Sequence, residues 1–196
     1  MPNDSTTGGY IVPGTPELDA YDATLEDIIQ GALAGITGLA GNLVRPKWQP
    51  EPANQPDKSV DWCAFGLSLT DQDITHYEVH DPTAGTNGAD RQERDEQWEL
   101  LVMFYGPNSS KFMARLRDGL LLEQNRWTLY QNDLKVRYVG QPTNVPALLK
   151  ESWVRRVDLR IQLARRVNRI YPIRDVASAT VITNAEVITV TSQINP

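Results

Sequence analysis

The stretch Trp153–Ile173, WVRRVDLRIQLARRVNRIYPI, carries the clearest structural signal in the chain. Every odd position in its centre is apolar, and the positions between them are polar: Val157, Leu159, Ile161 and Leu163 alternate with Asp158, Arg160 and Gln162. Strict alternation is typical of a strand with one face on a core and the other in water. The stretch is longer than the usual strand of about 5–6 residues. We therefore expect a bend or bulge near Ala164–Arg166, where the alternation blurs.

The outer face of this expected strand is basic. The stretch and its next residue hold seven arginines against one acid, Asp158, namely Arg155, Arg156, Arg160, Arg165, Arg166, Arg169 and Arg174. The whole chain has 19 Lys+Arg, 25 Asp+Glu and a net charge of −6, so generic nucleic-acid affinity is not expected from its whole surface. Three interpretations stay open: non-specific contact with DNA phosphates, contact with an acidic helix of a neighbouring copy, or a charged exterior.

The N-terminal part of the chain is acidic. Before Arg45 it contains six acids and no base: Asp4, Glu17, Asp19, Asp22, Glu26 and Asp27. Thr15-Pro16-Glu17 is a helix start, and apolar residues then recur at helical spacing to Leu39. We expect Gly31, Gly35 and Gly38 to let another backbone approach closely, and Gly38 or Gly41 to end the helix. The acidic counterpart of the arginines is predicted to be Asp19, Asp22, Glu26 and Asp27.

The remaining patterns predict strands, two helices and a terminal hairpin. Strands are expected at Asp61–Leu69, Ile74–His80, Gln97–Tyr105 and Leu134–Val139, helices at Ser110–Leu122 and Gln124–Gln131, and a hairpin at Ala179–Thr191. The fold class is therefore α+β, an antiparallel or mixed β-sheet with two main helices packed on one face, plus a C-terminal β-hairpin. We expect a flexible N-terminal arm at 1–14, a single α+β domain at 15–175 and a hairpin or arm at 176–196.

The sequence gives little indication of a catalytic site. His76, Glu78 and His80 share one face of an expected strand, with Tyr77 and Val79 facing inward. The two histidines would lie ~13 Å apart, too far for one metal ion, so a metal-dependent hydrolase is a minor alternative. The acids from Asp90 to Glu99 are expected in a solvated loop and strand edge. We predict that the protein binds no metal ion or cofactor and is not an enzyme.

Three further features of the sequence bear on the cellular compartment in which the protein is made. The single cysteine, Cys63, fits a reducing compartment and the role of a small buried hydrophobe rather than a nucleophile. The apolar run Ile28–Val44 is interrupted by glycines and is shorter than the ~20 residues that a membrane span needs. The first residues lack the features of a signal peptide. We expect a soluble protein made in the cytoplasm, with no membrane partner.

Two short stretches resemble a known family. Val44–Pro50, VRPKWQP, and Asp61–Gly66, DWCAFG, are similar to neck and tail-terminator proteins of contractile-tailed bacteriophages. The order of elements over Leu25–Ile173 is similar too, including a late strand that contains arginines. The resemblance implies a structural virion protein of the tail or neck, made in the host cytoplasm. It would form a ring, usually of six subunits, at the head-proximal end of the tail tube, stop tube growth and join the tail to the head-side connector.

The resemblance also implies candidate site residues and partners, but no catalytic residues. The family-motif or interface candidates are Arg45, Pro46, Trp48, Trp62 and Phe65. The ring-interface or DNA-lumen candidates are Arg155, Arg156, Arg160, Arg165, Arg166 and Arg169. Expected partners are further copies of the chain, tail-tube and sheath proteins, the head-side connector and passing genomic DNA. The alternatives are another head-tail adaptor, a tail-completion or tail-tube protein, or a cellular binding module.

Overall fold

The computed structural model describes residues 9–14, 20–49, 54–73, 75–83, 88–149, 151–173, 179–182 and 187–190. The chain divides into two compact units. The core unit consists of Asp19–Ile74 and Asp95–Arg166, and the small unit of Met1–Leu18, Thr75–Arg94 and Val167–Pro196. The expected division into arm, single domain and hairpin stays a prediction.

A mixed sheet forms the framework of the fold. Its main strands follow the order β1-β2-β4-β9-β5, with β3 paired to β4 and β6 paired to β9. The bounds are β1 Val44–Pro46, β2 Trp62–Gln72, β3 Tyr77–Asp81, β4 Ala89–Tyr105, β5 Lys135–Val139, β6 Thr143–Asn144 and β9 Arg156–Tyr171. Strand β1 runs parallel to β2, whereas β2 is antiparallel to β4 and β5 is antiparallel to β9. The expected α+β class with a mixed sheet is confirmed.

Strand β9 is the arginine strand that the alternation predicted. The apolar positions from Val157 to Leu163 are buried, as expected. The alternation continues beyond them, because Arg165 and Val167 are buried as well. The irregularity lies in the partner strand, where the register of β5 against β9 shifts between Val136 and Tyr138. The alternation of apolar and polar residues is interrupted in the sequence near Ala164–Arg166 because Arg165 occupies an inward position.

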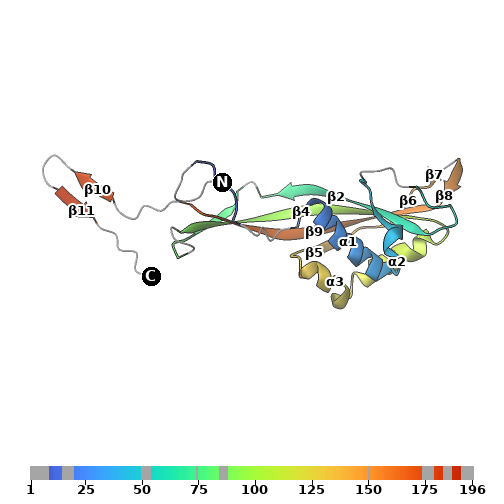
Figure 1. Ribbon diagram of the computed structural model, residues 1–196. Helices are drawn as coiled ribbons and strands as arrows, with labels where there is room; N and C mark the ends of the chain where they lie inside the picture. Colours follow the sequence, from blue (N-terminus) through green and yellow to red (C-terminus); the bar gives the residue numbers. More distant parts are fainter. Residues whose placement is uncertain are drawn as a thin grey trace. The chain divides into compact units, whose positions relative to one another are not determined.

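Three α-helices of the core unit cover one face of the sheet (Figure 1). They are α1 Asp22–Thr37, α2 Ser109–Gly119 and α3 Glu123–Tyr130, with a short 3-10 turn η1 at Gly41–Leu43. Helix α1 packs on both α2 and α3. It ends at Gly38, which has φ +77° and whose N–H donates to the carbonyl of Ala34 at 2.9 Å. Gly38 as the helix end is confirmed, while Thr15-Pro16-Glu17 lies outside the described residues.

The hydrophobic core lies between these helices and the sheet. Its largest fully buried residues include Ile29, Phe65, Phe104, Leu116, Leu134, Leu159, Ile161 and Leu163. They come from both helices and strands, and full burial of each such side chain contributes roughly 1.5–3 kcal/mol to stability. Cys63 is also fully buried in this core, and burial raises the pKa of its thiol to about 12. The prediction of a small buried hydrophobe is confirmed.

Gly31 and Gly35 are exposed, and no atom of the described residues lies within 4 Å of a Cβ placed there. Close approach of another backbone at these glycines is not seen within the described part of the subunit and stays a prediction for contact with another subunit. Other local predictions were wrong. Tyr77 is 67% exposed rather than inward. Strand β4 begins at Ala89, eight residues earlier than expected (97 minus 89). The acids Asp90 to Glu99 therefore lie within a strand, and Glu96 is buried.

Two hairpins complete the described structure. Strand β7 (Ala147–Leu149) pairs with β8 (Ser152–Val154) in the core unit, and Leu148 stands opposite Trp153. The sequence analysis did not predict this hairpin. In the small unit, β10 (Ala179–Ile182) pairs antiparallel with β11 (Val187–Val190). The predicted C-terminal hairpin is confirmed.

Candidate interaction surface

The sheet face away from the helices, which we call the outer face, carries a second apolar cluster. Successive residues of a strand point to opposite faces. Cys63, Phe65, Val102 and Phe104 belong to the helix-side core, so the intervening residues lie on the outer face. There, Trp62, Ala64, Met103, Tyr105 and Val154 pack together. The rings of Trp62 and Tyr105 stack with centroids 4.3 Å apart and planes inclined by 9°.

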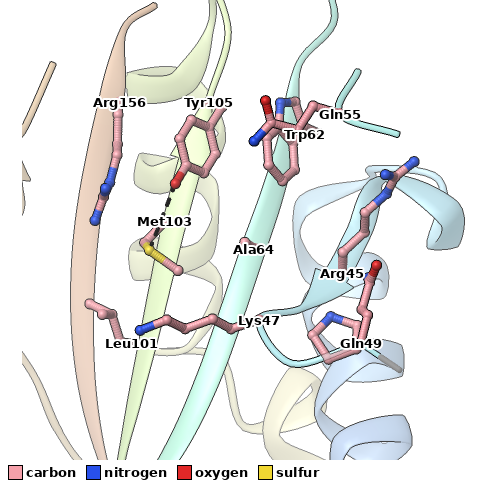
Figure 2. A pocket seen from close by; sticks show the side chains of 11 residues that line it. Arg45, Lys47, Gln49, Gln55, Trp62, Ala64, Leu101, Met103, Tyr105 and Arg156 are labelled. Atoms are coloured by element: carbon pink, nitrogen blue, oxygen red, sulfur yellow. Dashed lines mark hydrogen bonds between the residues drawn. The ribbon is translucent and has the colours of Figure 1, made fainter. Parts of the chain in front are cut away.

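A pocket of about 460 Å³ opens over this cluster, and we call it the sheet pocket (Figure 2). It is lined by Arg45, Pro46, Lys47, Gln49, Gln55, Trp62, Ala64, Leu101, Met103, Tyr105 and Arg156. The pocket joins the two stretches that carried the family resemblance, because β1 and β2 are neighbours in the sheet. It also includes one member of the arginine strand. The lining combines an apolar floor with three cations.

Among the described residues, two of these cations have no carboxylate partner. The Arg45 guanidinium donates from Nε to the Asn42 carbonyl at 2.9 Å and from Nη1 to the Asn54 carbonyl at 2.8 Å. The stem of Lys47 crosses β2 at Gly66, and its Cδ lies 3.4 Å from the place where a Gly66 Cβ would be. Figure 2 shows its ammonium group reaching toward Leu101. Within the described residues, neither cation forms an ion pair.

The third cation, Arg156, shares its charge with an acid on the same strand. Its Nε and Nη2 each donate to one oxygen of Asp158 at 2.6 Å. The guanidinium also lies 5.6 Å from the centre of the Tyr105 ring. The hydrogen bond that Arg156 donates to Asp158 raises the pKa of Arg156, while burial raises the pKa of Tyr105. Arg156 thus forms a fixed wall of the sheet pocket.

Arg165 does not lie on the outer face, which corrects the sequence prediction. Both Arg165 and Glu96 are buried on the helix side, and Arg165 Nε donates to Glu96 Oε2 at 3.0 Å. Arg165 Nη1 also donates to the carbonyl of Ala20 at 2.5 Å, just before α1. The Tyr21 hydroxyl and the Trp98 indole donate to Glu96 at 3.1 and 3.2 Å. We call these residues the buried ion-pair network.

Aromatic rings complete the surroundings of that buried arginine. The Arg165 guanidinium carbon lies 4.2 Å from the Tyr21 ring centre and 5.3 Å from that of Trp98. Burial by itself raises the pKa of Glu96. The hydrogen bond and the charge of Arg165, together with the two aromatic donors, outweigh burial and hold that pKa below its usual value. Glu96 is therefore ionised at neutral pH, and the network anchors the start of α1 to the sheet.

Two exposed arginines of β9 pair with acids of β4. Arg166 donates from Nε and Nη2 to the two oxygens of Asp95 at 2.8 and 3.1 Å. This hydrogen bond, against a smaller effect of burial, lowers the pKa of Asp95. Arg160 Nε lies 4.0 Å from Glu99 Oε1. Acids of the neighbouring strand therefore offset part of the positive charge of the β9 arginines. From the sequence alone, Asp158 was the one acid expected near them.

The comparison with protein families decides where this architecture belongs. Residues 23–191 match the family model described as phage neck terminator protein. The chain belongs to the phage neck terminator family. The resemblance that the two short stretches carried is confirmed at this level, and the family assigns the chain to the neck or tail of a bacteriophage virion. No curated protein matches the chain significantly.

In this neck terminator, the acidic counterpart predicted for the arginines lies on α1. Asp22 and Asp27 are exposed, Glu26 is partly buried, and Asp19 lies outside the described residues. Burial raises the pKa of Glu26, and the negative charges of Asp22 and Asp27 raise it further. We call Asp22, Glu26 and Asp27 the acidic face. In the described part of the chain no cation forms an ion pair with it.

The other predicted site residues of the terminator are scattered. Trp48, just after Lys47, is 72% exposed, whereas Phe65 is buried in the core and packs there. Arg155 is exposed, and Arg169 is partly buried in the small unit. The structure thus brings Arg45, Pro46, Trp62 and Arg156 together at one pocket. It does not bring Phe65 or Arg165 to the surface.

The structure also shows apolar surfaces that the sequence analysis missed. On the β7–β8 hairpin, Leu148 and Trp153 are 58% and 73% exposed. Leu121 and Leu122, which follow α2, and Trp127 on α3 are also exposed. Clustered exposed apolar residues are typical of protein contact sites. The signal that marks the hairpin is the repeat of apolar residues around Glu151, which has the positive φ of +62° that a tight turn uses.

The remaining chemistry of the neck terminator is sparse. His76 Nε2 lies 3.1 Å from Glu78 Oε2, and His80 Nδ1 lies 2.7 Å from Asp90 Oδ1. Each histidine therefore has its own carboxylate partner. Among the described residues there is no group of three or more His, Cys, Asp or Glu side chains that could hold a metal ion. No helix in the described part of the chain is both long and apolar enough to cross a membrane.

Proposed function

We propose that this protein forms a ring at the head-proximal end of the tail tube of a contractile-tailed phage. The ring stops tube growth and joins the tail to the head-side connector. It acts through contacts between proteins rather than through catalysis. The observation that carries the proposal is the family match over residues 23–191, since the family is that of phage neck terminators.

The distribution of contact surfaces on the core unit supports a ring. A closed cyclic assembly uses two different patches on each subunit, one of which meets the other patch on the next subunit. The core unit has the sheet pocket on its outer face, and its acidic face lies on α1, which covers the opposite side of the sheet. Its exposed apolar residues on the β7–β8 hairpin, after α2 and on α3 supply further contact area. We propose six subunits for the ring.

The proposed partners follow from this position in the virion. They are the tail tube, the sheath and the head-side connector, with genomic DNA passing through the ring. Exposed arginines such as Arg155 and Arg160 suit non-specific contact with phosphates. Because Arg160 also faces Glu99, its contribution to DNA contact is weaker than that of an unpaired arginine.

Native mass spectrometry and electron microscopy of the purified full chain test the proposal. The expected result is a closed ring that binds one end of isolated tail tubes and halts their elongation. A tube subunit would instead give stacked rings that elongate. A chain that stays monomeric at high concentration, and that leaves tube length unchanged when added to growing tubes, would overturn the proposal.

A further inference from the structure

We propose that the sheet pocket binds the acidic face of α1 from a second copy of the chain. The carboxylates of Asp22, Glu26 and Asp27 would contact the cations that line the pocket, chiefly Arg45 and Lys47. This inference rests on the proposed ring function, because it names the two patches through which neighbouring subunits meet.

The pocket side of this contact is a cation held over an apolar floor. The Lys47 side chain crosses β2 at Gly66 and ends near Leu101, above the surface formed by Ala64 and Met103 (Figure 2). A charge beside low-dielectric protein interacts more strongly with an opposite charge than a fully hydrated one does. Arg45, which donates to the backbone carbonyls of Asn42 and Asn54, adds a second positive charge on the adjoining strand. The pocket is therefore built to receive carboxylates.

The α1 side supplies carboxylates that form no ion pair with any described residue of their own subunit. Asp22, Glu26 and Asp27 stand on the first turns of α1, where Asp22 and Glu26 are four residues apart and lie on one side of the helix. Their mutual repulsion contributes to the raised pKa of Glu26. A cationic surface from another subunit relieves this repulsion and favours the ionised form of all three acids. Assembly should therefore be coupled to the ionisation of Glu26.

The positions of the two patches exclude a contact within one subunit. Helix α1 packs on the helix side of the sheet, while the sheet pocket opens on the outer face. The sheet itself separates them, so only a second copy can bring them together. When two subunits meet through one such contact, one subunit still has a free sheet pocket and the other a free acidic face. Further subunits can therefore add until the ring closes.

The surface of α1 beyond the acids leaves room for a neighbour. Asp27, Gly31 and Gly35 follow at intervals of four residues and therefore lie along one line of the helix. Both glycines are exposed and have open space around the position of a Cβ. A neighbouring surface that contacts Asp27 can approach the helix backbone closely at the two glycines.

A charge-swap experiment on the full chain tests this inference. Sedimentation measures self-association of the wild type, of Lys47→Glu, of Glu26→Lys and of the double variant that carries both changes. Each single variant should weaken self-association about tenfold or more, and the double variant should recover most of the loss, because close interfacial charges couple strongly. The control is Lys111→Glu on α2, which packs at the Thr37 end of α1. It should associate like the wild type.

Each outcome separates this inference from the proposed ring function. If the wild type forms rings and the single variants form them equally well, the pocket contact is wrong while the ring function stands. If each single variant loses assembly and the double variant does not recover, the pocket receives some other acidic segment and the inference is overturned. If the wild type neither associates nor caps tubes, the ring function itself fails. Thermal unfolding of each monomeric variant shows that a loss of assembly is not a loss of fold.

Discussion

The two faces of the sheet use the same residue types in opposite ways. On the helix side, Arg165 and Glu96 are buried, and their contacts with the Ala20 carbonyl and the Tyr21 hydroxyl anchor the start of α1. On the outer face, Arg166 and Asp95 form an equally short pair that water surrounds. Both arginines come from β9 and both acids from β4, and the residues of each pair are chain neighbours of those of the other. The comparison predicts that burial, rather than hydrogen-bond geometry, decides how much the loss of one partner destabilises the fold.

The largest expected effect comes from truncating each arginine in turn. Arg165→Ala leaves the Glu96 carboxylate buried without its cation, and breaking a buried pair in this way costs about 3–5 kcal/mol. Arg166→Ala removes an exposed pair, which contributes about 0.2–1 kcal/mol. Chemical denaturation followed by circular dichroism measures both free energies of unfolding. Similar losses for the two variants would contradict the contrast between the faces.

A double variant of the buried pair sharpens this first prediction. Replacing Arg165 by Met and Glu96 by Leu together removes both charges and keeps apolar volume, a change that is often neutral or stabilising. The double variant should therefore be more stable than Arg165→Ala. The carbonyl of Ala20 loses its donor in either variant, and in the double variant Tyr21 and Trp98 also lose their acceptor, so any remaining deficit reports on these three contacts together.

Acid titration distinguishes two glutamates with opposite pKa shifts. The pKa of Glu96 is lowered in the folded protein, so its stabilisation is present above the ordinary value of 4.5 and is lost as the pH falls through the folded value. The pKa of Glu26 is raised, so its ionisation destabilises the monomer as the pH rises through its folded value. Each glutamate changes the pH slope of stability by at most about 1.4 kcal/mol per pH unit.

Glutamine variants of the two glutamates provide the measurement. Between pH 3 and 6 (roughly one to two units around the usual glutamate pKa), Glu96→Gln should flatten the rise of monomer stability with pH. Glu26→Gln should instead make that rise steeper, because it removes a group with the opposite dependence. Urea denaturation at each pH gives the slopes. Two variants with slopes shifted in the same direction would contradict the assignment of these shifts.

The sequence predicted the helices and strands of the core unit better than it predicted which side chains of different strands contact each other. The alternation from Val157 to Leu163 and the glycine end of α1 correspond directly to observed structure, because both signals are local. The pairing of β4 acids with β9 arginines depends on strand order, which no local pattern contains. Arg165 was assigned to the outer face for the same reason. Its inward position becomes stable only where Glu96, Tyr21 and Trp98 surround it.

The candidate site was partly visible in the sequence as separate pieces. Arg45, Pro46 and Trp62 stood out through the family resemblance, and Arg156 through the basic stripe. Lys47 and Tyr105 received no particular role, although they provide a wall and the floor of the sheet pocket. The signal that links these pieces is strand periodicity in β2 and β4. Residues alternating with the core positions Cys63 and Phe104 must line the outer face.

The smallest expected effect concerns glycines on the solvent side of α1. Gly31 lies within the helix and has open space around it, so Gly31→Ala should stabilise the monomer by about 0.5–1 kcal/mol through its better helix propensity. The matched control is Gly38→Ala, where the φ of +77° disfavours any residue with a Cβ and costs roughly 1–2 kcal/mol. Thermal unfolding of the two variants should therefore show shifts of opposite sign. A destabilised Gly31→Ala monomer would mean that this side of α1 is not free within the subunit. A stabilised one leaves it open for contact with another subunit.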